Sequence, residues 1–442
     1  MRIAIGFVCV LFFSMLGVAH AEHSSNQWKK IDVAPGVYTV RDGNGAERQI
    51  RPSCSGGPVC TRDATTGQTT CRPGDTDYSF YYKRGKSSKL LVFFDGGGAC
   101  WDSTTCVTGN LTPVPAYVPE LGPGSDPATK GGLFNLQNAD NPYRDWSMVY
   151  VPYCTADVHW GSRDQTYLDF TGAATGTPGG TITLHHRGFD NFLYVREWIK
   201  HRFGEDDDEI EAVKKLLVVG SSAGAYGAAF AYPHLRKMFP RAKAYALADG
   251  GNGVMTDSFL NQAVKGVNAS WGVEQNLATW IPGITTLGSQ SAGNFLNAYY
   301  FALTGYHSRD RFAEYTTTWD VAQAVFYNIM LNQSNIAAWL NLSPAVYGAW
   351  TGQMVNNIYT RNAIPNYRFY VAEGCNHTVL RYNDDFYKPA SNQDIAFLDW
   401  FGALTRGRSS SAPTWQSSFC QNCTVPPTLA QVNACLMRSI AP

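Results

Sequence analysis

Residues 216–225 read Leu216-Leu-Val-Val-Gly-Ser-Ser-Ala-Gly-Ala225. The apolar run predicts a buried strand, the Gly-x-Ser-x-Gly pattern a sharp turn, and the small residues after it the start of a helix. Together they form the pattern of a nucleophile elbow, which holds its serine, here Ser222, in a strained conformation. Gly220 and Gly224 are expected where the backbone comes too close for a side chain. The alternative interpretation is an ordinary Gly-Ser turn.

Other strands and helices are expected on both sides of this elbow. Apolar runs predict strands at 78–82, 89–94, 146–151, 242–248 and 367–372. Helical patterns are expected at 189–203, 255–345 and 394–404. Pro233 is expected to end or kink the elbow helix, because proline lacks the backbone N–H. The alternation favours an α/β-hydrolase fold, with a mostly parallel sheet, helices on both faces and a helical insertion.

The N-terminal residues have the features of a secretory signal. Arg2 supplies the positive start, residues 3–18 the apolar run, and Ala19-His-Ala21 the cleavage site. The mature chain is expected to begin near Glu22, secreted or periplasmic, and no later stretch reaches membrane-spanning length. The predicted division is signal peptide 1–21, Cys-rich N-terminal extension 22–75, catalytic domain 76–406 and Cys-containing tail 407–442.

Charge and cysteine content narrow the classes of partner. Lys+Arg and Asp+Glu both number 35 in the 442-residue chain, which argues against a nucleic-acid partner and against electrostatic docking on membranes. Ten cysteines remain after cleavage, and an even count in an exported chain predicts up to five disulfides. The two cysteines of Cys420-Gln-Asn-Cys423 are better interpreted as disulfide cysteines, with their partners open, than as zinc ligands, since no second ligand pair completes a metal site.

A serine nucleophile needs a base, usually a histidine oriented by a carboxylate. After Ser222 the chain carries His234, His307 and His377. His234 lies just beyond the elbow helix and His307 in a helical stretch. His377 follows the last long strand in a loop, where this fold places its base, so we predict His377 as the base rather than a surface histidine.

The carboxylate that orients this base has two candidates. Asp249 ends the strand after the elbow, and Asp320 lies between the elbow and His377 in apparently helical sequence. Both precede His377, as the order Ser, acid, His requires. Spacing alone leaves them equal.

The oxyanion of the reaction needs N–H donors aimed at the developing charge. Ala223, directly after the nucleophile, is expected to supply one of them. The others should come from the loop after an earlier strand, and the run Gly96-Gly97-Gly98 follows the strand at 89–94. We therefore predict an oxyanion hole of Gly97, Gly98 and Ala223, although a triple glycine is also typical of a flexible turn.

These motifs resemble the pectin acetylesterase family over roughly residues 75–400. The resemblance is carried by residues 93–100, 220–224 and 248–250, by Asp320-Val-Ala-Gln323 and by the His377 loop. It implies a serine carboxylesterase without a cofactor, and it implies Asp320 as the acid, with Asp249 in a supporting role. Where relatives often have Gly-Gly-Trp-Tyr-Cys, this chain has Gly-Gly-Gly98-Ala99-Cys100, which predicts a wider pocket mouth. The resemblance also makes a disulfide of Cys100 plausible, with Cys106 its nearest candidate partner.

The sequence thus predicts an exported esterase that removes acetyl or other short acyl groups, from a polysaccharide such as pectin or from a small ester. One rival is a lipase or polyester depolymerase with the same three residues, whose acyl cleft would be formed by residues 102–145 and 255–345. Another is a non-catalytic carbohydrate-binding relative, which the aromatic content of 13% would suit. The oligomeric state stays open.

Overall fold

The computed structural model describes residues 27–63, 65–112, 115–204, 213–388, 395–406, 415–421, 423 and 426–440. The expected signal peptide at 1–21 lies outside these residues, as do residues 407–414 and Asp394, the start of the last expected helix. None of the helices within these ranges is long and apolar enough to cross a membrane.

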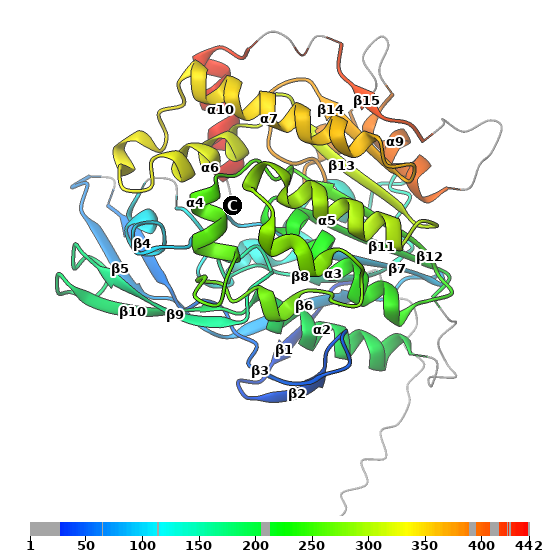
Figure 1. The fold of residues 1–442 in the computed structure, drawn as a ribbon, viewed down its shortest axis with the longest axis horizontal. Coiled ribbons are helices and arrows are strands. Elements are labelled where there is room, and N and C mark those ends of the chain that lie inside the picture. The colour runs from blue at the N-terminus through cyan, green and yellow to red at the C-terminus, as the bar shows by residue number, and fades with distance from the viewer. Residues whose placement is uncertain are drawn as a thin grey trace, which may run out of the picture.

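A nine-stranded, mostly parallel sheet runs through the molecule (Figure 1). Its strands, in spatial order, are β1 (Lys29–Val33), β6 (Tyr78–Lys83), β8 (Ser147–Val151), β7 (Lys89–Phe94), β11 (Lys215–Ser221), β12 (Lys243–Asp249), β13 (Arg311–Thr317), β14 (Tyr367–Ala372) and β15 (Ser418–Phe419). From β8 to β15 all neighbours are parallel, and β6 and β1 continue the sheet in antiparallel pairing. The predicted α/β fold with a mostly parallel sheet is confirmed.

The central strands are apolar on both faces. In β7, Leu90, Val92 and Phe94 belong to one core cluster, and Leu91 and Phe93 belong to the other. The apolar residues of β11 divide in the same way. Strands buried on both faces read as continuous apolar runs, which is why these two were visible in the sequence.

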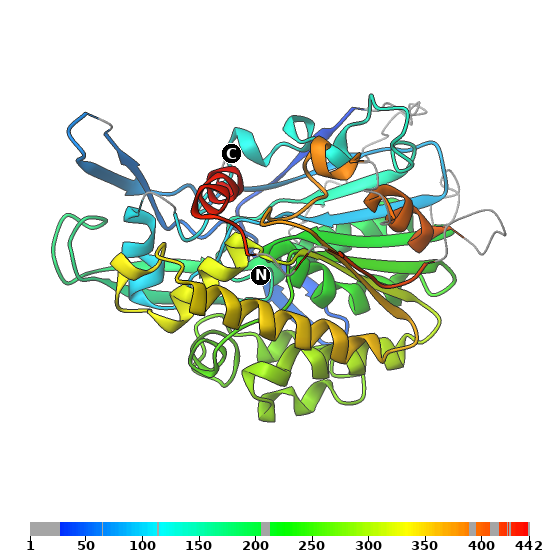
Figure 2. The ribbon, with the colours of Figure 1, turned by 90° about the horizontal axis from the view of Figure 1, so that it is seen from above.

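Helices cover both faces of the sheet (Figure 2). One core cluster receives side chains from α2 (Gly188–Phe203), α3 (Ala223–Met238), α5 (Ala292–Tyr306) and α7 (Pro344–Asn362). The cluster on the opposite face contains Trp400 and Phe401 of α9 (Phe397–Thr405).

Shorter elements lie around this framework. The remaining helices are α1 (Ser103–Cys106), α4 (Asp257–Phe259), α6 (Val321–Leu331), α8 (Asn383–Phe386) and α10 (Leu429–Ile440), besides short turns of 3₁₀ or π-helix. Three hairpins stand outside the central sheet: β2 (Tyr38–Arg41) with β3 (Glu47–Ile50), β4 (Pro58–Arg62) with β5 (Thr69–Pro73), and β9 (Arg163–Asp169) with β10 (Gly180–His186). The last two project from the same side of the molecule in both Figure 1 and Figure 2.

All ten described cysteines are paired, which confirms the expectation of up to five disulfides. The pairs are Cys54–Cys154, Cys60–Cys71, Cys100–Cys106, Cys375–Cys435 and Cys420–Cys423. The pairing of Cys100 with Cys106 is the one that the sequence suggested. The Cys54–Cys154 bond attaches the N-terminal part to the rest of the chain, and the Cys375–Cys435 bond attaches the tail.

The elbow helix was expected to end or kink at Pro233, but α3 continues through it to Met238. A proline inside a helix leaves the carbonyl four residues earlier without its N–H donor. Here that carbonyl belongs to Ala229, and it accepts a hydrogen bond from the Tyr299 hydroxyl of α5 at 3.0 Å. The neighbouring helix therefore replaces the missing donor, which a reading of local sequence does not reveal.

The region 255–345, expected to be mostly helical, also contains a central strand, β13. Its Glu314 is 1% exposed and forms an ion pair with the fully buried Arg361 of α7, with Nε and Oε2 2.8 Å apart. The Tyr367 hydroxyl of β14 bonds to the same carboxylate. Charged residues are rare in buried strands unless they are paired, so the sequence of β13 lacks the usual apolar signal.

This ion pair predicts an effect on stability. We expect Arg361→Met to lower the free energy of unfolding by about 3–5 kcal/mol, because it leaves the Glu314 carboxylate buried without a counter-charge. Urea denaturation measures the change. The double variant Arg361→Met/Glu314→Leu removes both charges and should recover most of the loss. Equal instability of the single and double variants would contradict the electrostatic explanation.

Candidate active site

Five neighbouring parallel strands bring functional side chains to one edge of the sheet. β7 ends before Asp95, β11 before Ser222, β12 at Asp249, and β13 and β14 lead to Asp320 and His377. Because the carboxyl ends of parallel strands share an edge, residues far apart in the chain meet there.

Ser222 occupies a strained turn between β11 and α3. Its φ of 59° and ψ of −125° are unusual for a residue with a side chain, and its N–H donates to the Asp249 carbonyl at 2.7 Å. A Cβ added at Gly220 would lie 2.0 Å from the Gly224 carbonyl oxygen, and one at Gly224 would lie 2.0 Å from that of Phe94. The glycines of the Gly-x-Ser-x-Gly pattern therefore stand where no side chain fits.

His377 and Asp320 form a buried pair. His377 Nδ1 lies 2.9 Å from both carboxylate oxygens of Asp320, and the side chains are 7% and 0% exposed. Nε2 of His377 has no hydrogen-bond partner in the part of the chain that the structure describes. His377 lines the same pocket as Ser222. A ring held through Nδ1 with Nε2 free is the arrangement that a general base requires.

Asp320 is itself fixed by the start of α6. As the N-cap residue it accepts the Gln323 backbone N–H at 3.0 Å and the Gln323 side-chain amide at 2.9 Å. The amide oxygen of Gln323 accepts the Asn252 N–H at 2.9 Å. The segment that looked helical is thus a strand end followed by a capped helix, and both oxygens of the capping carboxylate also lie 2.9 Å from the histidine ring.

Asp249, the other candidate acid, has a different environment. Its side chain is fully buried and accepts hydrogen bonds from Ser221 Oγ at 2.7 Å, Leu380 N at 3.0 Å and Val379 N at 3.1 Å. Burial raises the pKa of Asp249 to about 6. The structure therefore brings Asp320 rather than Asp249 to the histidine ring, and Asp249 fastens the loop that carries it.

The other two histidines lie away from the pocket. His234 is buried in α3 against Phe189 and Trp280, and burial lowers its pKa well below the usual range. His307 caps the end of α5, with Nδ1 3.7 Å from Asp310. Neither borders the space beside Ser222.

The glycine loop after β7 passes directly beside the serine. A Cβ added at Gly96 would lie 2.6 Å from Ser222 Cβ. Within the described ranges, the N–H groups of Gly97 and Gly98 meet no acceptor, and Ala223, as first residue of α3, has no intrahelical acceptor. These three donors are the ones expected from the sequence, and they are free to receive a negative charge.

Asp95 connects this loop to the loop of His377. Its carboxylate accepts from the Gly96 N–H at 2.9 Å, from the Tyr150 hydroxyl, and from Arg381 Nη1 at 2.9 Å. His159 Nε2 lies 2.9 Å from the Asp95 carbonyl oxygen, and burial lowers the pKa of His159 to about 4, so the ring is neutral at physiological pH. No local sequence pattern indicates these contacts, although Asp95 follows a buried strand immediately before three glycines.

An apolar pocket opens beside Ser222 and His377. Besides these two, its walls are formed largely by Trp101, Val158, Trp160, Tyr226, Val254, Met255, Phe259, Trp271, Phe326 and Met330. At the expected mouth, Gly98 and Ala99 contribute no bulky side chain.

A second, more polar groove also reaches Ser222 and His377. It is bordered by the glycine loop, by Asn110, Lys130 and Arg381, and by Leu436 of α10. Cys375, two residues before His377, is disulfide-bonded to Cys435 of the same helix. The tail is therefore part of the wall of the site.

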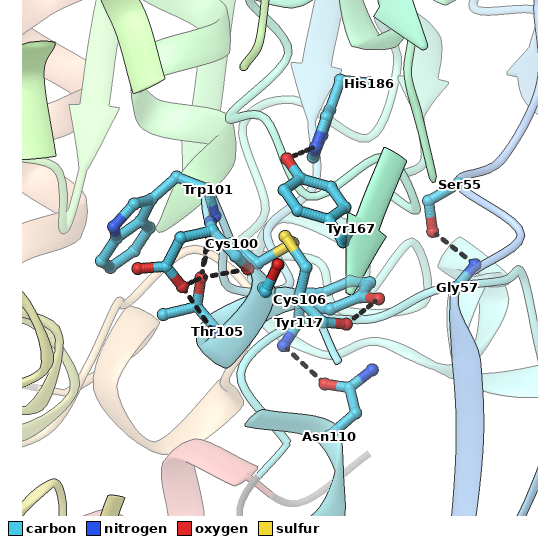
Figure 3. The surroundings of a disulfide bond; sticks show 12 residues. Ser55, Gly57, Cys100, Trp101, Thr105, Cys106, Asn110, Tyr117, Tyr167 and His186 are labelled. Carbon is cyan, nitrogen blue, oxygen red and sulfur yellow. Dashed lines mark hydrogen bonds between the residues drawn. A yellow bond between two sulfur atoms is a disulfide. The ribbon is translucent and has the colours of Figure 1, made fainter. Parts of the chain in front are cut away.

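One group of side chains has metal-ligand chemistry within the described ranges: Cys100, Cys106 and His186. Figure 3 shows that the two cysteines are joined in a disulfide and that His186 faces Tyr167. His186 Nε2 bonds to the Tyr167 hydroxyl at 2.7 Å, and Nδ1 lies 3.0 Å from the Thr155 carbonyl oxygen. The two thiols are paired and both ring nitrogens of His186 are engaged. Cys100, Cys106 and Tyr167 belong to one buried cluster, so these residues have a structural role.

Residues 57–282, just over half of the chain, match the sequence profile of the family described as pectinacetylesterase. The palmitoleoyl-protein carboxylesterase notum1 of Xenopus laevis is 30% identical over 167 residues, 36% of this chain and 28% of that protein. NOTUM of Homo sapiens is 26% identical over 191 residues, 41% of this chain and 34% of that protein. These matches span only about a third of the relatives' length.

A third relative, described as an inactive palmitoleoyl-protein carboxylesterase notum1b of Danio rerio, is 32% identical over 101 residues. The match covers 22% of this chain and 69% of that protein. Relatives thus include proteins described as enzymes and one described as inactive.

Asp249 predicts a pH dependence of stability. Its raised pKa means that the folded protein holds this proton more tightly than the unfolded chain, in which an aspartate ionises near pH ~3.9. Between about pH 4 and pH 6 the unfolded state gains stability by ionising and the folded state does not, so the unfolding free energy falls as pH rises. The expected fall from this group is about 3 kcal/mol.

The variant Asp249→Asn cannot titrate and should lack this contribution. Urea denaturation of both proteins at pH 4 and pH 7 gives the difference, in which all other groups cancel. Parallel pH dependences of the two proteins would contradict the raised pKa of Asp249.

Proposed function

The chain belongs to the pectinacetylesterase family, and from this premise we propose that it is a carboxylic ester hydrolase acting through Ser222, His377 and Asp320. Ser222 Oγ attacks the ester carbonyl while His377 Nε2 takes its proton, and Asp320 holds the ring through Nδ1. The N–H groups of Gly97, Gly98 and Ala223 receive the oxyanion.

The reaction then proceeds in two halves. Collapse of the tetrahedral intermediate breaks the bond to the alcohol, which takes the proton from His377 and leaves an acyl-Ser222 enzyme. Water, deprotonated by His377, attacks the acyl carbonyl, and a free acid and the unmodified serine result. No group beyond this chain and water is needed to balance the steps.

The observation that carries the proposal is the position of His377. One ring nitrogen is held at 2.9 Å by a buried carboxylate, and the ring lines the pocket shared with Ser222. The strained backbone of Ser222 supports the same assignment, because strain of this kind persists only where surrounding structure enforces it. An ordinary Gly-Ser turn offers no reason for it.

The two spaces beside Ser222 suggest how an ester is divided between them. We assign the acyl group to the apolar pocket and the alcohol to the polar groove. The lining of the first space is almost entirely aromatic and aliphatic, which suits an apolar acyl chain. This lining favours the lipase-like alternative. Several of the lining residues lie within 255–345, one of the two segments that this alternative named, whereas none of the described residues of 102–145 lines the pocket.

Acetyl esters of a polysaccharide such as pectin form the second candidate substrate. The family description favours them, and the groove with its asparagine, lysine and arginine can take a polar alcohol. Five disulfides support an exported protein, because such bonds persist in oxidising compartments.

The catalytic assignment predicts a steep loss of activity in single variants. Ser222→Ala should lower kcat/KM on a soluble 4-nitrophenyl ester by at least about 10⁴-fold, and Asp320→Asn by a similar factor. Asp384, an exposed carboxylate seven residues after His377 in the chain, gives the matched control: Asp384→Asn should retain full activity. A folded wild-type chain that neither cleaves esters nor reacts with a fluorophosphonate would support the non-catalytic alternative.

The substrate assignment predicts the dependence on acyl length. On 4-nitrophenyl esters from C2 to C16, we expect the highest kcat/KM at C6 or longer, because each buried methylene adds about 0.8 kcal/mol of binding. A maximum at C2 would instead favour the acetylesterase candidate, and acetylated pectin would then be the substrate to test.

A further inference from the structure

Helix α6 separates the acyl pocket from a second apolar pocket that the proposed reaction does not use. Ala322, Phe326 and Met330, spaced four residues apart, lie on the stripe of α6 that borders the acyl pocket. Val325 and Ile329 lie on the adjacent stripe and border the second pocket. One helix therefore presents neighbouring faces to two apolar spaces.

The second pocket is bordered by residues from three parts of the chain and is partly open to solvent, since Leu340 is 37% exposed. Its remaining walls are Thr112, Pro115, Ala116, Ile336, Ala337, Trp339 and Leu340. Every one of these except Thr112 is apolar, and Trp339 is 3% exposed. The space could hold hydrocarbon if it were connected to the acyl pocket.

Two features form the partition between these pockets. One is the backbone pairing of Ala99 with Ala116, whose N–H and carbonyl oxygen are 3.0 Å apart. Ala99 borders the acyl pocket and Ala116 the second pocket, so this part of the wall is main chain. The other is the side chain of Phe326, the only residue that lines both pockets among those described for each.

We propose that Phe326 is a specificity-determining residue, whose ring confines the acyl group to the first pocket and thereby limits its length. The ring is a removable barrier, whereas the Ala99–Ala116 pairing is not. Without the ring of Phe326, the acyl pocket and the second pocket become one continuous apolar space. The inference rests on the proposed function, since it assumes that the pocket beside Ser222 receives the acyl group.

The test compares the wild-type chain with Phe326→Ala on 4-nitrophenyl esters from C4 to C16. Wild-type kcat/KM should fall beyond the longest acyl group that the first pocket holds. In Phe326→Ala the maximum should move to longer chains, and each newly buried methylene should raise kcat/KM by about fourfold. A rise of about tenfold or more in the ratio of C16 to C8 is therefore expected.

Two further variants make the result specific to the partition. Ile329 borders only the second pocket. The single variant Ile329→Ala should therefore have the same C16 to C8 ratio as the wild-type chain. Adding Ala337→Trp to Phe326→Ala refills the second pocket and should return the ratio toward the wild-type value. If Phe326→Ala does not fold, Phe326→Leu tests the same barrier, with a smaller shift in the same direction.

The outcomes separate this inference from the proposed function. An unchanged length profile in folded Phe326→Ala, with hydrolysis still dependent on Ser222, would overturn the role of Phe326 alone. Absence of hydrolysis by the wild-type chain, or hydrolysis that survives Ser222→Ala, would overturn the proposed function instead.

Discussion

The geometry of the site depends on the hydrogen bonds that the buried Asp249 accepts. Its backbone carbonyl receives the N–H of Ser222, and its side chain receives Ser221 Oγ and the N–H groups of Val379 and Leu380. One residue at the end of β12 thus fixes both the turn of Ser222 and the loop of His377. Burying a carboxylate is costly, and the three donors offset that cost.

Strands could be predicted from the sequence where all their side chains are apolar and buried. They could not be predicted where a buried strand contains a charged residue. β7 and β11 could be recognised because both faces are apolar, so the strands read as continuous runs. β13 could not, because Glu314 finds its counter-charge on α7, 47 positions further on. The prediction that the elbow helix ends or kinks at Pro233 was wrong for a related reason. The hydroxyl that bonds to the carbonyl left without a donor comes from Tyr299 of α5. In each case the missing information was a partner distant in sequence.

The site shows the same division. Ser222 and His377 could be proposed from motif and chain order, but spacing left Asp249 and Asp320 equal, and only family resemblance separated them. The two acids differ in what their carboxylates contact. Asp320 contacts the His377 ring, whereas Asp249 accepts hydrogen bonds from backbone N–H groups that follow His377 in the chain. The contact of Asp95 with Arg381, across 286 positions, has no local signal at all.

The disulfide between Cys375 and Cys435 sets an order for the assembly of the site during biosynthesis. Every strand of the central sheet and the whole Ser222 elbow are translated before Cys435. Until that cysteine has been made and oxidised, the segment before His377 lacks its covalent tie to α10. Thiols stay reduced in the cytoplasm, so a chain that has not reached an oxidising compartment lacks this tie. Until then, the loop of His377 depends on its non-covalent contacts with Asp320 and Asp249.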